Sequence, residues 1–252
     1  NQEDLNIPLL KSHLQKCIRR KLHTKAVKTA YQLINYNFNE FIRRINIIML
    51  EDVILMDSYC NLIWMMLAFS TRKWNPERIH VEWLLGVVHN LCESNLYNEY
   101  TTLKIYPKKL YISDLNQEQK ALIYSMQIRA SYGGLKSDMI MIQDLINRNI
   151  DTFRNGGNVN KIKVRRVSIV LEFLPYKQFH LSGVDFHCYP FMIKSVKKKY
   201  PELFEDEISK LIWIYSSRVN PRKNKIPKEN DKWKKIKKYV KWLSRKILES
   251  IE

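Results

Sequence analysis

The chain has 252 residues, of which 45% are hydrophobic and 12% aromatic, and this excludes an intrinsically disordered protein because such chains carry little apolar surface. Lysines and arginines number 43 against 25 acidic residues, which gives a formal net charge of +18. An excess of this size repels itself in the folded state, so it predicts a polyanionic partner: nucleic acid first, an anionic membrane surface second. A basic protein without such a partner is the alternative.

The scarcity of turn-forming residues predicts helices. Six glycines and eight prolines are few for a β-rich protein of this length, so we expect an all-α or predominantly α fold. No stretch of 18 apolar residues and no signal-like beginning occurs, so we expect no membrane span. The cysteines are widely spaced and form no C-x-x-C pair, which favours reduced thiols and an intracellular setting, nucleus or cytoplasm.

The first half of the chain shows one helical pattern after another. From Leu9, apolar residues recur at helical spacing (Leu10, Leu14, Cys17 and Ile18), and the opposite face is basic. A second helix is expected from Thr24 as its N-cap. Further helices are expected over residues 38–49, 59–69, about 75–94 (beginning at Asn75-Pro76-Glu77), 116–132 (opened by an Asn116–Gln119 capping box) and 137–148.

The second half is less regular. Residues 154–158 contain Gly156 and Gly157 and form the best linker signal in the chain. Residues 162–174 suit a helix by spacing and a strand by their β-branched residues, so both remain open. Helices are expected after Pro190 and Pro201 and over residues 228–250. We therefore expect a helical bundle over residues 1–150 and a smaller mixed or helical part over 151–252.

Residues 9–57 resemble part of a known family. Residues 11–20 are similar to that family's segment around K-S-I-R, and Ala26, Ala30 and Leu33 follow at matching spacing. Residues 41–45 and 51–55 are similar to its F-I-A-R-R-L and E-D-I-G-L segments, with Ile54 in place of the glycine. The family is the MgsA/RarA-type replication-associated recombination ATPases, relatives of the clamp loaders, and the similar region is their C-terminal helical collar.

This resemblance covers about a fifth of the chain and implies a collar-like helical bundle. It also implies a DNA replication or DNA repair setting, with self-association as an oligomer or contacts to other replication-complex proteins. The ATPase module of the family is absent from this sequence, because no G-x-x-x-x-G-K-[ST] phosphate-binding loop occurs.

The expected C-terminal helix has the clearest amphipathic pattern. Its narrow apolar seam consists of Trp233, Ile236, Val240, Leu243, Ile247 and Ile251. Between Arg222 and Lys246 twelve basic residues stand against two acidic ones, a ratio too one-sided for ordinary surface ion pairs. We expect the seam to pack on the core or on a partner helix and the lysines to bind a polyanion. A solvated charged face and a membrane surface are the alternatives.

Basic residues elsewhere join this prediction. Gly133-Gly134 followed by Lys136 and a helix start offers the elements of a phosphate site, although a C-cap glycine followed by a Ser or Asp N-cap is the plainer interpretation. The predicted nucleic-acid-binding residues are Lys16, Arg19, Arg20, Arg43, Arg44, Arg129, Lys136, Lys234, Lys235, Lys238, Lys241 and Arg245.

Residues 180–188 hold the densest cluster of reactive side chains: His180, Asp185, His187 and Cys188. In an extended segment Asp185 and His187 point to the same side, and with His180 folded back they would offer two or three ligands for Zn²⁺. The spacing matches no standard zinc signature. The favoured interpretation is a structural loop in which Asp185 accepts backbone N–H bonds at the next helix start.

The predicted function is a non-catalytic nucleic-acid-binding factor of a replication or repair complex, which binds the phosphate backbone through the basic C-terminal helix and the helix at residues 11–28. DNA is favoured over RNA, and no cofactor is expected. The alternative is a metal-dependent enzyme acting on nucleic acid through the cluster at 180–188. A paired-carboxylate nuclease is not favoured, because Glu51, Asp52, Glu172 and Asp185 lack the acid-plus-lysine spacing of a two-metal site.

Overall fold

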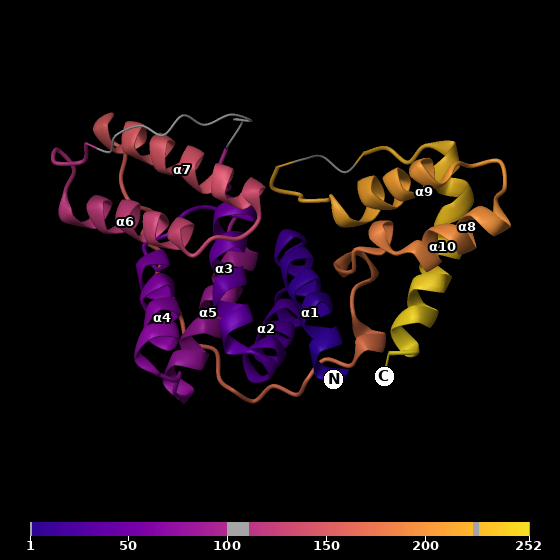
Figure 1. Cartoon of the computed structure of the whole chain (residues 1–252), viewed down its shortest axis with the longest axis horizontal. Coiled ribbons are helices and arrows are strands. Elements are labelled where there is room, and N and C mark those ends of the chain that lie inside the picture. Colours follow the sequence, from indigo (N-terminus) through magenta and orange to yellow (C-terminus); the bar gives the residue numbers. More distant parts are fainter. Residues whose placement is uncertain (1, 100–110, 224–226, 252) are drawn as a thin grey trace. The chain divides into compact units, whose positions relative to one another are not determined.

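The structure is a computed structural model that describes residues 2–99, 111–223 and 227–251. These residues form ten α-helices, four short helical turns and no β-strand (Figure 1). The predicted all-α fold is therefore confirmed. None of the helices described is both long enough and apolar enough to cross a membrane.

Two compact units make up the chain. Unit 1 comprises residues 1–36 and 170–252, and unit 2 comprises residues 37–169. The sequence placed a boundary near residue 150, whereas the structure groups the N-terminal helices with the C-terminal part. The physical reason is that the first helix makes its polar contacts with residues 180–222, and no local sequence pattern reveals contacts over such a separation.

The N-terminal half of unit 1 is a helical hairpin. Helix α1 (Gln2–Arg19) packs against α2 (His23–Tyr36), and Lys21 in the turn between them has a left-handed backbone with φ of 57°. The four apolar residues that predicted α1 are all fully buried: Leu10, Leu14, Cys17 and Ile18. Helix α1 begins before the expected Leu9, and α2 begins one residue before the expected Thr24 cap.

The C-terminal half of unit 1 contains three α-helices and four short turns. They are η1 (Tyr176–Gln178), η2 (Leu181–Gly183), η3 (Phe186–Cys188), α8 (Pro190–Lys199), α9 (Glu205–Ile212), a π-helical turn η4 (Trp213–Ser217) and α10 (Asp231–Glu249). Helix α10 packs on α8 and η1, and α1 packs on η2. The expected helices after Pro190 and Pro201 correspond to α8 and α9.

A buried histidine joins the two halves of unit 1. His13 on α1 is fully buried, and its ring stacks on Phe179 with 3.9 Å between ring centroids. Its Nδ1 lies 2.8 Å from the Thr29 hydroxyl on α2, and its Nε2 accepts the backbone N–H of His180 at 2.9 Å. Because Nε2 accepts, the ring is neutral. Gly183 allows this contact, since a Cβ atom there would lie 2.3 Å from the imidazole.

Unit 2 is a bundle of five helices: α3 (Phe38–Asp52), α4 (Tyr59–Arg72), α5 (Arg78–Glu93), α6 (Gln117–Ser131) and α7 (Lys136–Arg154). The capping box of Asn116 and Gln119 is present as predicted. Glu77, rather than Asn75, caps α5, where His80 completes a second capping box. Helix α7 extends past the expected Arg148 to the Gly156-Gly157 turn, where Gly156 has a φ of 84°. Between α5 and α6, residues 100–110 lie outside the described residues.

An extended segment crosses α5. We call residues 159–169 the basic strap. Its backbone is not helical. It is held against α5 by two hydrogen bonds: the N–H of Val167 donates to the Glu82 carbonyl at 3.0 Å, and the Asn90 amide donates to the Lys163 carbonyl at 3.2 Å. Ile162 and Val164 are half-buried, while Lys161, Lys163 and Arg165, which alternate with them, are exposed. Residues 162–169, for which both a helix and a strand were open, are therefore an extended segment that forms hydrogen bonds with a helix and not with another strand.

Gly86 permits this crossing. A Cβ atom at Gly86 would lie 2.1 Å from the Arg165 carbonyl oxygen and 2.9 Å from a Val164 methyl group. We expect Gly86→Ala to displace the strap. This should outweigh the higher helix propensity of alanine, which by itself stabilises a helix by about 1 kcal/mol relative to glycine. Calorimetry should show a lower Tm, and limited trypsin digestion should cut faster after Lys163 and Arg165.

The control for this experiment is Asn90→Ala, which removes one side-chain hydrogen bond and leaves room for the strap. It should speed the cleavage less than Gly86→Ala does. An unchanged cleavage rate in Gly86→Ala would show that the strap does not depend on its close approach to α5.

The buried histidines of unit 1 predict acid sensitivity. Burial, with Lys25 nearby, lowers the pKa of His13 to about 3, and burial together with Arg20 lowers the pKa of His180 to about 4. Both are neutral in the folded state, whereas the unfolded chain protonates them near pH 6.5. The unfolded state therefore binds more protons below about pH 6.5, and stability should fall from there towards pH 4 by up to about 1.4 kcal/mol per pH unit for each histidine.

Urea denaturation between pH 7 and pH 4.5 measures this slope. His180→Gln should reduce it by roughly one histidine's share, since one fewer site gains a proton on unfolding. His89→Gln, on α5 in unit 2, is the control. A slope that His180→Gln leaves unchanged would contradict the assignment.

Candidate nucleic-acid interface

Helix α10 separates its apolar and basic residues onto opposite sides. Asn230 caps it by accepting the Trp233 N–H at 2.8 Å, and Asp231 adds an acid in the first turn. Trp233, Ile236, Val240 and Leu243 of the predicted seam are buried, and Trp233 stacks on Tyr215 with 5.1 Å between ring centroids. The seam therefore packs within unit 1.

The end of the seam departs from the prediction. Leu248 is buried, whereas Ile247 and Ile251 are half-buried. They line a cleft of about 660 Å³ together with Pro8 and Leu9 of α1. The helical period does not cause this departure, because the seam averages one helical turn of 3.6 residues per step. Ile247 and Ile251 remain on the seam side of α10 but face the cleft instead of the core.

The lysines of α10 are exposed, apart from the half-buried Lys237, and most of them have acidic partners. Pairs within the helix or at its start are Lys234–Asp231 at 3.0 Å, Lys237–Glu229 at 2.5 Å and Lys246–Glu249 at 2.9 Å. Two further pairs reach acids outside the helix: Lys232–Glu207, on α9, and Lys235–Glu202, after α8. The sequence analysis compared the basic residues from Arg222 to Lys246 only with acids in the same segment, so it missed Glu207 and Glu202.

Three cations of α10 form no ion pair in the part of the chain that the structure describes, although the charge of Lys241 contributes to lowering the pKa of Glu229. Lys238 and Lys241 are exposed, and no hydrogen bond or ion pair to them is present among those residues. Arg245 donates to the backbone carbonyls of Lys177 and Phe179, so its charge is held in place and not neutralised. These three residues lie one turn apart in succession along one side of the helix.

Sequence reasoning missed the aromatic residues on this side. Trp242 is 54% exposed and stacks on Tyr239, with ring centroids 5.5 Å apart and an interplanar angle of 20°. Tyr200, just after α8, meets Tyr239 edge-on at 6.2 Å. The available signal was that Trp242 lies off the apolar seam, two residues from Val240 and next to Leu243, and so points away from the core.

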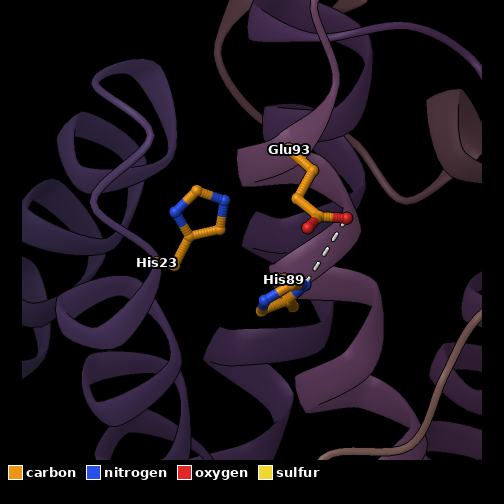
Figure 2. Close-up of side chains that lie close together, drawn as sticks. All are labelled: His23, His89 and Glu93. Carbon is orange, nitrogen blue, oxygen red and sulfur yellow. Dashed lines mark ion pairs between the residues drawn. The ribbon is translucent and has the colours of Figure 1, made fainter.

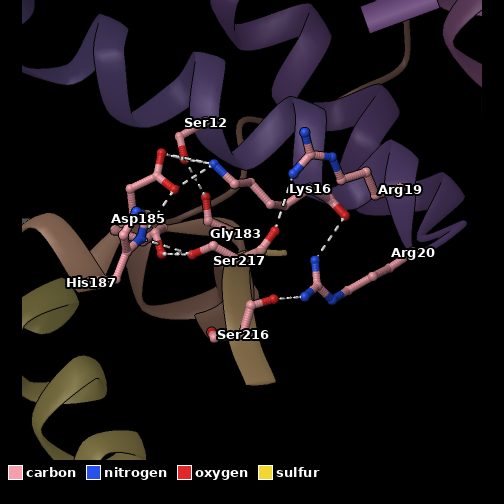
Figure 3. A network of polar contacts seen from close by, with 10 residues as sticks. Ser12, Lys16, Arg19, Arg20, Gly183, Asp185, His187, Ser216 and Ser217 are labelled. Carbon is pink, nitrogen blue, oxygen red and sulfur yellow. Dashed lines mark hydrogen bonds and ion pairs between the residues drawn. The ribbon is translucent and has the colours of Figure 1, made fainter. Parts of the chain in front are cut away.

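The basic residues of α1 serve the fold (Figure 3). The Lys16 ammonium is buried and lies 2.7 Å from both carboxylate oxygens of Asp185. The Ser12 hydroxyl donates to the same carboxylate at 3.0 Å. Burial alone would raise the pKa of Asp185, but the Lys16 charge and these hydrogen bonds outweigh burial and lower that pKa. The expectation that Asp185 accepts backbone N–H groups is therefore wrong.

Arg19 and Arg20 bind the end of the π-helical turn (Figure 3). Arg19 donates to the Ser217 carbonyl at 3.1 Å, and Arg20 donates to the Ser216 carbonyl. Carbonyl groups at the end of a helix lack partners within it, so two guanidinium groups are suitable donors. Both arginines belong to the packing of unit 1 and not to an open basic surface.

Of the predicted basic residues of unit 2, two donate to backbone carbonyls and one is exposed. Arg129 is 3% exposed and donates to the Gly133 carbonyl at 2.9 Å, so it closes the end of α6. Arg43 donates to the Tyr132 carbonyl at 3.5 Å, and Arg44 is half-buried. Lys136 is exposed at the start of α7. The N-cap there is Leu135 and makes no side-chain cap, so neither the Ser nor the Asp that was expected occupies that position.

The strap contributes basic residues that sequence reasoning left out. Lys163, Arg165 and Arg166 line a cleft of about 760 Å³ at the end of α5. His89 and Glu93 line it as well and lie one turn apart on α5, with 3.8 Å between Nδ1 and a carboxylate oxygen (Figure 2). The missed signal was the alternation of basic and apolar residues from 161 to 165, which is typical of an extended chain with one side buried.

The cluster at 180–188 is built as a connection between helices. Lys16 already occupies the Asp185 carboxylate, so a metal ion would have to displace a buried ammonium. Partial burial and the nearby Asp185 raise the pKa of the Cys188 thiol, which disfavours the nucleophilic thiolate. Ser217 and Asp185 both face the same nitrogen of His187, at 3.4 and 3.7 Å. A hydrolytic triad needs two different imidazole nitrogens, so these three residues do not form one.

Comparison of the chain with protein-family models, curated proteins and solved structures finds no significant match. The function therefore has to be argued from the arrangement of these residues.

The pair of Lys16 and Asp185 gives a stability prediction. The Lys16 side chain is 7% exposed and that of Asp185 is 43% exposed. Asp185→Asn should cost about 1–3 kcal/mol, because it leaves a buried ammonium without its countercharge, and the exposure of Asp185 reduces the loss below that of a fully buried pair. Urea denaturation measures the difference.

A double-mutant cycle supplies the control. Lys16→Met keeps the length of the side chain and removes the charge, so Lys16→Met combined with Asp185→Asn should be more stable than Asp185→Asn alone. Strictly additive effects of the two changes would mean that the pair contributes no coupling energy.

Proposed function

We propose that this protein binds nucleic acid through the exposed side of α10, contacting the phosphate backbone and catalysing no reaction. The observation that carries the proposal is the division of α10. Most of its seam is buried in unit 1, while Lys238, Lys241 and Arg245 lie in succession on the other side and form no ion pair in the described part of the chain. A run of cations fixed by a buried seam is suited to a polyanion.

The paired lysines of α10 add to this surface. Exposed ion pairs contribute only about 0–1 kcal/mol each, so phosphate groups can replace Glu202 or Asp231 as partners of Lys235 and Lys234 at little cost. Lysine is a point charge and lacks the planar fork with which arginine reads guanine. Binding through this surface is therefore expected to follow the phosphate backbone rather than a base sequence.

The setting in DNA replication or repair is a further part of the proposal and rests on the resemblance of residues 9–57 alone. Those residues run from α1 into α3 and cross the boundary between units 1 and 2. A collar formed from that segment as one module is thus less well supported than binding by α10. We base the proposal on the charge of α10.

The salt dependence of binding tests the proposal. Fluorescence anisotropy with a labelled oligonucleotide should give a log–log slope of the affinity against salt of about −3 to −6, as expected for four to six phosphate contacts. Changing Lys238 and Lys241 together to Gln should weaken binding and reduce the slope by about 1–2. A flat salt response would contradict the proposal.

A matched control separates local from overall charge. Changing Lys120 and Lys161 of unit 2 to Gln lowers the net charge by the same amount and leaves α10 intact. Equal losses of affinity in the two double variants would mean that overall charge, not the surface of α10, attracts the nucleic acid.

A further inference from the structure

An aromatic surface lies among the basic residues of α10 and the end of α8. We call Tyr200, Tyr239 and Trp242 the aromatic row. The rings follow one another at centroid distances of 6.2 and 5.5 Å. Tyr200 and Tyr239 are half-buried, and Trp242, at the end of the row, is more than half exposed.

Lysines accompany this row. The ammonium of Lys199 lies 4.1 Å from the ring centroid of Tyr239, and those of Lys199 and Lys235 each lie 6.0 Å from the centroid of Tyr200. Lys238 is one helical turn before Trp242, and Arg245 is three residues after it. Of these lysines, Lys235 forms an ion pair with Glu202. Flat apolar rings and cations thus share one exposed surface.

We propose that this surface binds single-stranded nucleic acid, with an unpaired base stacked on Trp242 and the adjoining phosphates at Lys238, Lys241 and Arg245. This inference rests on the proposed function and deepens it, because it names the form of nucleic acid that is bound. Aromatic side chains stack on unpaired bases of any sequence, and cations beside them follow the backbone. In a duplex the bases stack on one another, so an exposed indole has no base face to contact.

A membrane surface fits the same residues less well. A helix that lies in a bilayer interface inserts a continuous apolar face. The apolar face of α10 is buried in unit 1, where Trp233, Ile236 and Val240 are each at most 5% exposed. What remains exposed is a stacked pair of rings surrounded by charges, and this arrangement offers a stacking platform with little apolar surface to insert.

The test compares three probes on the whole chain at one salt concentration. They are a single-stranded oligodeoxythymidine of about 20 nucleotides, a mixed-sequence duplex of equal length and anionic phosphatidylserine vesicles. The single strand should bind more tightly. Trp242→Ala should weaken its binding about 5-fold to 100-fold, as expected for the loss of one stacked base, and should leave duplex binding nearly unchanged. Trp242→Phe should retain most of the affinity, because a phenyl ring still stacks.

Trp64→Ala is the matched control. Trp64 is 55% exposed, as Trp242 nearly is, but it lies on α4 of unit 2 and not on the surface formed by α10 and the end of α8. It should leave both nucleic-acid affinities unchanged. If both nucleic-acid probes bind with steep salt dependence but equally well, and Trp242→Ala changes neither, the single-strand inference is overturned and the proposed function stands. If neither nucleic-acid probe binds, the proposed function fails. If Trp242→Ala weakens binding only to anionic phosphatidylserine vesicles, the surface is a membrane contact and the inference is overturned.

Discussion

The hydrogen bonds from α1 to residues far along the chain hold unit 1 together. Lys16 reaches Asp185, Arg19 and Arg20 reach the π-helical turn, and His13 accepts from the backbone of His180. These contacts join segments separated by all of unit 2. Leaving one of these buried donors or acceptors without its partner would lower the free energy of unfolding by about 1–3 kcal/mol. The C-terminal half of unit 1 therefore has one favourable position on the hairpin. The position of α10, and with it the exposed basic side, follows from that constraint.

The cationic side chains have two roles, to hold the fold together and to present charge to solvent, and Arg245 takes part in both. Arg19, Arg43, Arg129 and Arg245 each donate to backbone carbonyls, where a planar group with several donors closes the end of a helix or fixes a loop. The lysines of α10 extend into solvent, where a flexible chain keeps a strongly hydrated charge available. Lys16 is the exception, because its stem lies in the core and its charge ends on Asp185. Net charge therefore overstates the basic surface that a partner meets.

The sequence was sufficient for whatever depends on local periodicity and capping. The helices around Leu14, Phe41 and Leu122 and the Asn116 capping box follow from spacing alone, and they are present. Contacts between segments that are distant in the sequence could not be predicted from local patterns. Asp185 was expected to cap a backbone segment because its partner, Lys16, lies 169 residues away. Glu202 and Glu207 were not counted against the lysines of α10 because they approach only in the fold. Trp242 could have been found from its position off the seam, whereas its stacking on Tyr239 required coordinates.

Because unit 2 is inserted within unit 1, the order of synthesis differs from the order of assembly. Residues 37–169 leave the ribosome before residues 170–252, so unit 2 is complete while the α1–α2 hairpin still lacks most of its domain. During that interval the part of α1 that packs on η2 and the Lys16 ammonium lack their partners. Closing unit 1 then joins segments more than 130 residues apart, which is the slow, non-local kind of step in folding. The hairpin is thus the part of this chain with the longest exposure to chaperones and to aggregation during translation.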